Sequence, residues 1–227
     1  MKIDEITNLL LSMQNEDNAN GMQRFGIKGN LLGISVVELR KIAKQIKTDH
    51  SLALNLWQSP FHEAKLLATM IADKQQMTSK EMDCWVKDFY GWDIVDQACS
   101  NIFKYLSFSQ DKVFEYAKSD EEYVRRTAFS LIATMTFNKK IPDSKFEEYL
   151  PLIEKYSFDE RNFVWKAVDW ALRSIGKRDM YLHDKALQEA DALLLLNNKN
   201  SKKIGRISQK ELLDEKTILR IKTKEKK

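Results

Sequence analysis

The sequence predicts an all-α protein built as a solenoid of paired helices. Glycine and proline are scarce, with 7 and 3 among 227 residues, whereas a β-sandwich or a loop-rich α/β fold needs a turn residue every few positions. Amphipathic helical patterns also recur at short intervals along most of the chain. Helices of roughly 10 to 18 residues that repeat in pairs about every 35 to 45 residues are typical of HEAT-like solenoids.

Apolar spacing and capping residues place the individual helices. Ser35 with Glu38 and Thr78 with Glu81 have the spacing of capping boxes, and Asp49 is a further N-cap. A helix at 3–13 is followed by a polar loop at 15–21 and a glycine-containing connection at 22–32. Gly176 is expected at the C′ position of its helix. The remaining helices are predicted at 36–46, 50–57, 61–71, 79–89, 92–106, 109–117, 120–137, 143–156, 159–176, 181–196 and 208–221.

These helices are expected to form one HEAT-like repeat domain over residues 1–197, followed by a basic C-terminal helix and tail at 198–227. Such an α-α superhelix would be C-shaped, with a basic concave face as its binding surface. A compact, non-repetitive bundle satisfies the same pattern, because no identity between repeats can be aligned.

The net charge of +4 conceals an asymmetry along the chain. Residues 161–227 contain 17 Lys and Arg against 9 Asp and Glu, whereas residues 1–160 contain 20 against 24. A polyanion would be attracted to the C-terminal third. A solvated helix surface with a basic tail explains the asymmetry equally well.

The remaining composition indicates a cytoplasmic protein without cofactors. The chain starts with no secretory pattern and has no apolar run approaching ~18 residues, so no membrane contact is expected. Cys84 and Cys99 lack the spacing of a zinc site or a redox motif, which favours two reduced thiols. No metal site is therefore predicted.

Trp170 lies outside the apolar stripe of helix 159–176. Lys166 and Arg173 flank it on the same side, with Lys177 one turn further. An indole among cations suits a nucleic acid, because the cations hold phosphate while the ring packs on sugar or base. Packing of Trp170 against a neighbouring helix is the alternative. The predicted buried stripe comprises Val164, Ala167, Val168, Ala171, Leu172 and Ile175.

The helix that begins at Trp92 shows the same kind of exception. Trp92 and Asp96 are four residues apart and share a face outside the predicted core stripe of Ile94, Val95, Ala98, Ile102 and Leu106. Asp96 could simply be an acid favoured by the helix dipole, although Asp93 fits that role better.

Arg125 and Arg126 likewise lie off the apolar stripe of helix 120–137. A surface pair of arginines is by itself weak evidence for a specific function.

Three strings resemble signature segments of the AlkD-type DNA alkylation repair proteins, the HEAT-like repeat DNA glycosylase family. They are GWDIVDQ at 91–97, EEYVRRTAF at 121–129 and FVWKAVDWALRSIGKR at 163–178. The string FGIKGNLLGISVVELRKIAK at 25–44 is similar to the N-terminal region of that family. The resemblance spans roughly residues 20–195.

The resemblance implies a DNA glycosylase that hydrolyses the N-glycosidic bond of cationic N3- or N7-alkylated purines in duplex DNA. It implies base-excision repair without base flipping, by chemistry that needs no metal. A monomer is the default expectation for a solenoid clamped on DNA. Asp96 matches the catalytic carboxylate of the family, and Trp92 and Trp170 match its sugar-contacting tryptophans. The expected DNA-binding residues are Arg126, which matches a phosphate-binding arginine, and Arg125, Lys166, Arg173 and Lys177.

Two positions depart from the family pattern. Trp165 stands where the family often has a polar or basic residue, and Asp169 replaces a frequent glycine and adds negative charge near Trp170. Two other functions stay open at this point. One is a non-catalytic HEAT-repeat binder of damaged or branched DNA, and the other is a protein-interaction scaffold.

Overall fold

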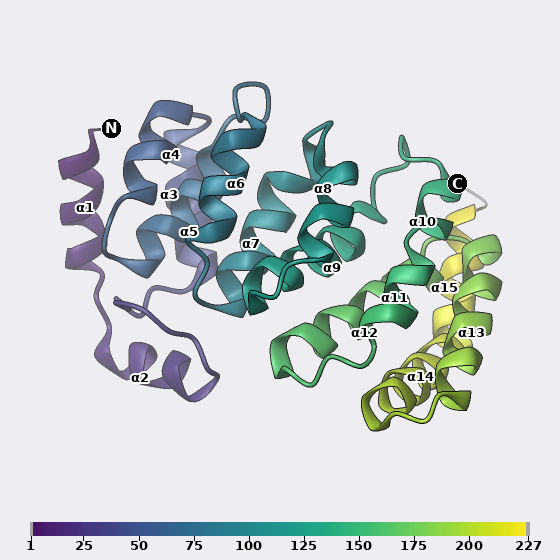
Figure 1. Ribbon diagram of the computed structural model, residues 1–227. Coiled ribbons are helices and arrows are strands. Elements are labelled where there is room, and N and C mark those ends of the chain that lie inside the picture. The colour runs from purple at the N-terminus through teal and green to yellow at the C-terminus, as the bar shows by residue number, and fades with distance from the viewer. Residues whose placement is uncertain (1, 226–227) are drawn as a thin grey trace. The chain divides into compact units, whose positions relative to one another are not determined.

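The computed structural model describes residues 2–225, and its regular elements are helical throughout that range (Figure 1). The one β-type contact found there is an isolated parallel bridge between Asn30 and Phe61. This confirms the prediction of an all-α chain. Contacts between residues group the chain into two compact units, residues 1–109 and 110–227. Each unit is described by itself below.

Unit 1 contains short amphipathic helices, and most of them begin at a capping residue. Asn15, Ser35, Asp49 and Thr78 each accept a backbone N–H of the following first turn, and Thr78 forms a complete capping box with Glu81. The elements are α1 (Ile3–Ser12), α2 (Glu16–Arg24), α3 (Val36–Ile46), α4 (His50–Trp57), α5 (His62–Ile71), α6 (Ser79–Lys87), α7 (Trp92–Asn101) and the 3-10 helix η1 (Phe103–Tyr105).

A buried carboxylate fixes the connection between α2 and α3. Glu63 on α5 is fully buried and accepts the backbone N–H groups of Leu32 (2.9 Å), Gly33 (2.8 Å) and Ile34 (3.3 Å). Gly33 has φ +77°, and a Cβ built there would lie 2.0 Å from the carbonyl oxygen of Asn15. The connection can therefore pass close to α2 only with glycine at this position.

Helix α9 of unit 2 is buried along most of its length. Residues 126–135 of this helix are all buried. It packs along α12, and α12 in turn contacts α13 and α14 (Figure 1). The elements are α8 (Ser109–Ala117), α9 (Glu122–Met135), α10 (Asp143–Glu147), α11 (Leu150–Tyr156), α12 (Asn162–Gly176), α13 (Met180–Leu195), α14 (Lys199–Leu212) and α15 (Glu215–Glu225).

Four sequence-based predictions of local structure are wrong. Residues 16–24 form helix α2 instead of a loop, because Asn15 caps the helix and Glu16 and Asp17 complement its dipole. The predicted helix 92–106 ends at Asn101 and is followed by η1, and the predicted helix 143–156 is divided into α10 and α11. Gly176 is the last residue of α12, not its C′ residue. Glycine fits there for a packing reason, because a Cβ would lie 2.8 Å from the Leu212 side chain.

The C-terminal region also differs from the expected single helix at 208–221. Helix α14 begins at Lys199, where Asn198 accepts the N–H groups of Asn200 and Ser201. Asp214 accepts the N–H of Thr217 and thereby starts α15. The proposed domain division at residue 197 stays a prediction, although α14 packs on α12 and α13. The last residues of the predicted basic tail, 226–227, lie outside the described residues.

Cys84 is exposed and Cys99 is buried, and neither forms a disulfide. Within residues 2–225, no helix is long and apolar enough to cross a membrane.

Burial of Glu189 on α13 makes the stability of unit 2 depend on pH. Burial, with Glu154 adding to it, raises the pKa of this carboxyl to about 7 from an ordinary value of 4.5. Its Oε1 atom has no hydrogen-bond partner among the described residues. The folded state therefore favours the neutral acid, and the free energy of unfolding falls as pH rises from about 4.5 through about 7.

Glu189→Gln is accordingly expected to stabilise the protein at pH 8 and to have little effect at pH 5. Partial access to solvent limits the gain to about 1 to 2 kcal/mol. Urea unfolding at both pH values measures it, with the exposed Glu160→Gln as the control. Equal changes in stability at the two pH values would show that Glu189 does not titrate as described.

Candidate functional site

Trp92 and Asp96 lie on one side of α7, outside the core of unit 1. The predicted core stripe of this helix is confirmed, because Ile94, Val95 and Ala98 are fully buried. Trp92 and Asp96 are both half-buried and one helical turn apart. The indole Nε1 of Trp92 donates a hydrogen bond to the carbonyl oxygen of Phe25 (3.2 Å). An indole and a carboxylate thus lie one helical turn apart on this face of α7.

A buried polar network holds the first turn of α7 in place. Asp93 Oδ2 lies 2.6 Å from Nε2 of His62, and the other ring nitrogen of His62 lies 2.9 Å from the Tyr90 hydroxyl. His62 is fully buried, and burial, with Asp93 and Glu63 adding to it, raises the pKa of Tyr90. Asp93 therefore ties α7 to α5, a role that its position near the helix start did not reveal.

Trp170 lies in unit 2, on the side of α12 that faces away from its buried stripe. All six residues of that predicted stripe are fully buried, which confirms it, whereas Trp170 is half-buried. Trp170 lines a pocket of about 770 Å³ in unit 2. The other residues that line it come from the segment that follows α9, from α12 and the turn after it, and from α10, α14 and α15. They include Phe137, Lys139, Lys177, Arg178, Glu211, Arg220 and Lys224.

Arg178 organises one edge of this pocket. Its guanidinium donates to the carbonyl oxygens of Thr136 (2.8 Å), Asn138 (3.0 Å) and Ile141 (2.7 Å), and it pairs with Asp143 (2.7 Å). Exposed cations line the same pocket at Lys139 and Arg220. Lys139 and Arg220 were not predicted from the sequence, because Lys139 lies in a turn and Arg220 belongs to a helix with no recognised motif.

The surface position that the sequence indicated for Arg126 is wrong. Its side chain is 5% exposed and donates to the carbonyl oxygen of Phe163 on α12 (2.6 Å). Ten successive residues of α9, 126–135, are buried, so a residue off its apolar stripe is buried as well. Arg126 thus joins α9 to α12, and its contact with phosphate stays a prediction.

Arg125 is held by acidic and carbonyl groups of the protein. It pairs with Asp159 (2.7 Å) and donates to the carbonyl oxygen of Ala117 (3.0 Å). Burial of Asp159 raises its pKa, but hydrogen bonds from Arg161 and Arg125 outweigh burial and hold the pKa below its usual range. Much of the positive charge of Arg125 is therefore compensated within unit 2.

The same holds for Arg173 and Lys177 beside Trp170. Arg173 pairs with Asp169 (2.8 Å) and with Glu211, and Lys177 pairs with Glu211 (2.6 Å). The charge of Asp169 is thus compensated by Arg173. Of the five cations expected to bind DNA, Lys166 is the one that is exposed.

The structure therefore places the predicted residues in two groups. Trp92 and Asp96 belong to unit 1, whereas Trp170 and the five cations belong to unit 2. A joint action of the two groups stays a prediction. In the described part of the chain, no group of three or more His, Cys, Asp and Glu residues could hold a metal ion.

Comparison with solved structures defines the fold. The chain aligns with a structure described as belonging to a new family of proteins related to the HEAT-like repeat DNA glycosylases with affinity for branched DNA structures. The TM-score is 0.79 and the sequence identity 21%, and the alignment covers 93% of this chain and 94% of the other. The fold is therefore the HEAT-like repeat fold, as predicted.

The chain belongs to the DNA alkylation repair enzyme family, whose family model matches residues 6–211. A designed armadillo repeat protein in complex with a (KR)4 peptide also aligns, with 16% identity over 89% of this chain and 97% of the other. Its TM-score is only 0.43. Comparison with curated proteins gives no match.

Proposed function

We propose that this protein is a DNA glycosylase that releases N3- or N7-alkylated purines from duplex DNA by hydrolysing the N-glycosidic bond. The observation that carries the proposal is the pairing of Trp92 and Asp96 on the side of α7 that faces away from the core. Membership of the DNA alkylation repair enzyme family supports the substrate class. A carboxylate has no use in simple phosphate binding, because it repels the backbone.

The chemistry requires stabilisation of positive charge on the sugar. Alkylation at N3 or N7 makes the purine cationic, so the base leaves without protonation by the enzyme. As the glycosidic bond breaks, the electron pair goes to the base and the sugar becomes an oxocarbenium ion. The Asp96 carboxylate stabilises this cation and orients a water molecule for attack at the anomeric carbon, and it takes up the proton that the water loses. The π face of Trp92 favours the same positive charge.

Trp170 serves in this proposal as a second aromatic surface for the sugar-phosphate strand. It is accompanied by the exposed cations Lys139 and Arg220, which line the same pocket and suit phosphate. The base itself needs no binding pocket in this scheme, because selectivity comes from the lability of cationic lesions. Bulky adducts should then be tolerated.

Incubation with a duplex that contains a single 7-methylguanine tests the proposed activity directly. Free 7-methylguanine and an abasic site are expected as products, whereas the unmodified duplex should stay intact. The release is measured by chromatography of the base and by strand cleavage at the abasic site with alkali. Duplex binding without any base release would contradict the proposal.

Binding of branched DNA without catalysis is the second candidate. It is favoured by the description of the structure with a TM-score of 0.79, whose family has affinity for branched DNA structures. A four-way junction and a linear duplex of the same length separate the two candidates. Tighter binding to the junction, together with intact 7-methylguanine, would favour this second function.

A further inference from the structure

Four exposed cations form a single row along α14. Lys199, Lys203, Arg206 and Lys210 are all exposed and follow the spacing i, i+4, i+7, i+11. At 100° per residue this spacing keeps all four within a narrow strip on one side of a helix. At ~1.5 Å per residue, the row extends over roughly 16 Å. We refer to these four residues as the α14 stripe.

The stripe lies opposite the buried face of α14, so the helix presents it to solvent. The buried residues of α14 are Ser201, Ile204, Gly205, Ser208 and Leu212. A Cβ at Gly205 would lie 2.7 Å from the carbonyl oxygen of Ala190, which shows how closely α14 approaches α13. Ser201 also hydrogen-bonds Ser157 (2.7 Å). These contacts hold the four cations on a rigid support.

No carboxylate in the described residues pairs with the α14 stripe. Glu211, the acid within α14, is instead bound to Arg173 and Lys177. This contrasts with four of the cations first expected to bind DNA, whose side chains are bound within the protein. The stripe therefore retains its positive charge for an external anion.

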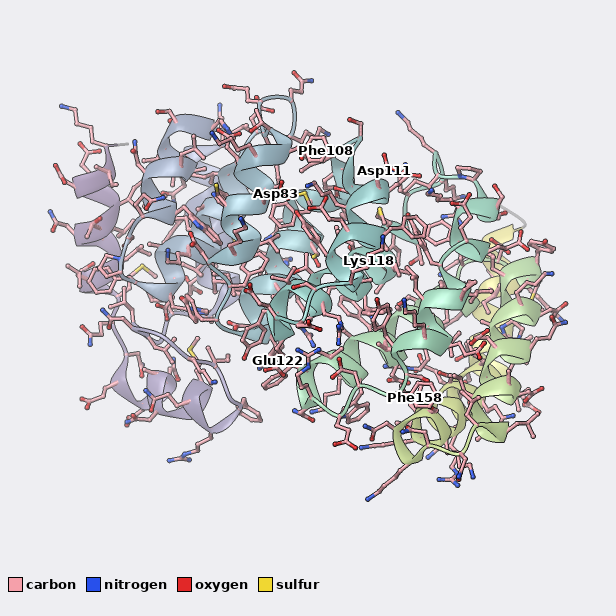
Figure 2. The ribbon with its side chains drawn as sticks, in the orientation of Figure 1. Asp83, Phe108, Asp111, Lys118, Glu122 and Phe158 are labelled. Atoms are coloured by element: carbon pink, nitrogen blue, oxygen red, sulfur yellow. The ribbon has the colours of Figure 1, made fainter. Side chains whose placement is uncertain are left out.

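Aromatic rings accompany one end of the stripe. The Nζ of Lys203 lies 3.7 Å from the centroid of the Trp165 ring, and the Nζ of Lys166 lies 5.8 Å from it. Phe158, which is 46% exposed, lies in the loop before α12 (Figure 2), next to the residue that bonds Ser201. Cations next to exposed aromatic rings are typical of surfaces that bind nucleic acid.

We propose that the α14 stripe, with Lys166 and Trp165 beside it, is a binding surface for the sugar-phosphate backbone of duplex DNA. This inference rests on the proposed function in taking DNA as the partner. The four cations, spread over ~16 Å on one side of α14, can contact phosphates of one DNA strand.

The test replaces all four cations by glutamine, which keeps the helix propensity of the segment. The variant K199Q/K203Q/R206Q/K210Q is compared with R40Q/K44Q/K80Q/K87Q, which removes one Arg and three Lys from exposed positions of unit 1. Fluorescence anisotropy measures the affinity for an undamaged duplex at several salt concentrations. Circular dichroism verifies that both variants are folded.

The stripe variant is expected to bind duplex DNA about tenfold more weakly or worse at low salt. Each lost phosphate contact should reduce the slope of log affinity against log salt by about 0.9, so the slope should become less negative by about 3 to 4. In the control variant, the slope should change by less than the ~0.9 expected for one phosphate contact. Equal losses in the two variants, or an unchanged slope in the stripe variant, would overturn the inference.

Two further measurements separate this inference from the proposed glycosylase activity. Loss of DNA binding in the stripe variant, together with a wild-type protein that releases no 7-methylguanine, would support the stripe and refute the glycosylase. Base release by a stripe variant whose affinity for DNA is unchanged would support the glycosylase and refute the stripe as a DNA-binding surface. Wild-type binding to polyglutamate or anionic vesicles as tight as to duplex DNA would refute DNA as the partner of the stripe.

Discussion

Asp96→Asn is expected to slow the release of 7-methylguanine by about 10²- to 10³-fold, the loss typical when one group that stabilises transition-state charge is removed. Asparagine has nearly the same shape as aspartate but no negative charge, so the developing sugar cation loses its partner. The affinity for undamaged duplex should stay the same or rise slightly, because a carboxylate repels phosphate. Single-turnover base release and anisotropy on the same samples measure the two effects.

Asp93→Asn is the matched control for that experiment. It is the same substitution three residues earlier on α7, but at a carboxylate that bonds buried His62. It should lower the free energy of unfolding by about 1 to 2 kcal/mol, while the folded protein still releases base. Similar losses of activity in both variants would assign the effect to a distorted α7 and remove Asp96 from the mechanism.

Glu63→Ala is expected to lower the free energy of unfolding by about 3 to 5 kcal/mol. It leaves three backbone N–H groups of residues 32–34 without their acceptor in a buried segment, and an unsatisfied buried group costs about 1 to 3 kcal/mol. Because whole domains are stable by only about 5 to 15 kcal/mol, the variant should unfold at much lower urea concentration. Tryptophan fluorescence during urea unfolding measures the shift.

Two further variants define the origin of that effect. Glu63→Gln keeps one acceptor oxygen, so its free energy of unfolding should lie between those of the wild type and the alanine variant. Glu115→Ala removes an exposed glutamate that pairs with Lys112 on α8, and it should change the stability by about 0.5 kcal/mol or less. A loss at Glu63→Ala as small as that control would mean that water replaces the carboxylate in the connection.

Apolar periodicity predicted the parts of the fold in which a helix has one buried face. The stripes of α7 and α12 are buried as expected, because each contains branched aliphatic residues at helical spacing. The same spacing left Trp92, Asp96 and Trp170 outside the core, so the sequence sufficed to single them out.

Apolar periodicity did not predict the buried positions of a helix that is buried all round, or of a helix that buries a face of small residues. Helix α9 is buried at ten successive positions, 126–135, so Arg126 is buried although it lies off the apolar stripe. Helix α14 buries Ser201, Gly205 and Ser208, which a search for apolar residues does not detect. Its start and its row of cations were missed for that reason.

The hydrogen bond between the Trp92 indole and the Phe25 carbonyl oxygen limits what this side chain can recognise. Tryptophan has a single polar hydrogen, and here the protein itself binds it. Only the ring surface then remains for a ligand, and a ring surface does not distinguish one nucleobase edge from another. Contacts through Trp92 should consequently be indifferent to the nucleotide sequence around a lesion, as suits a protein that must act wherever damage falls.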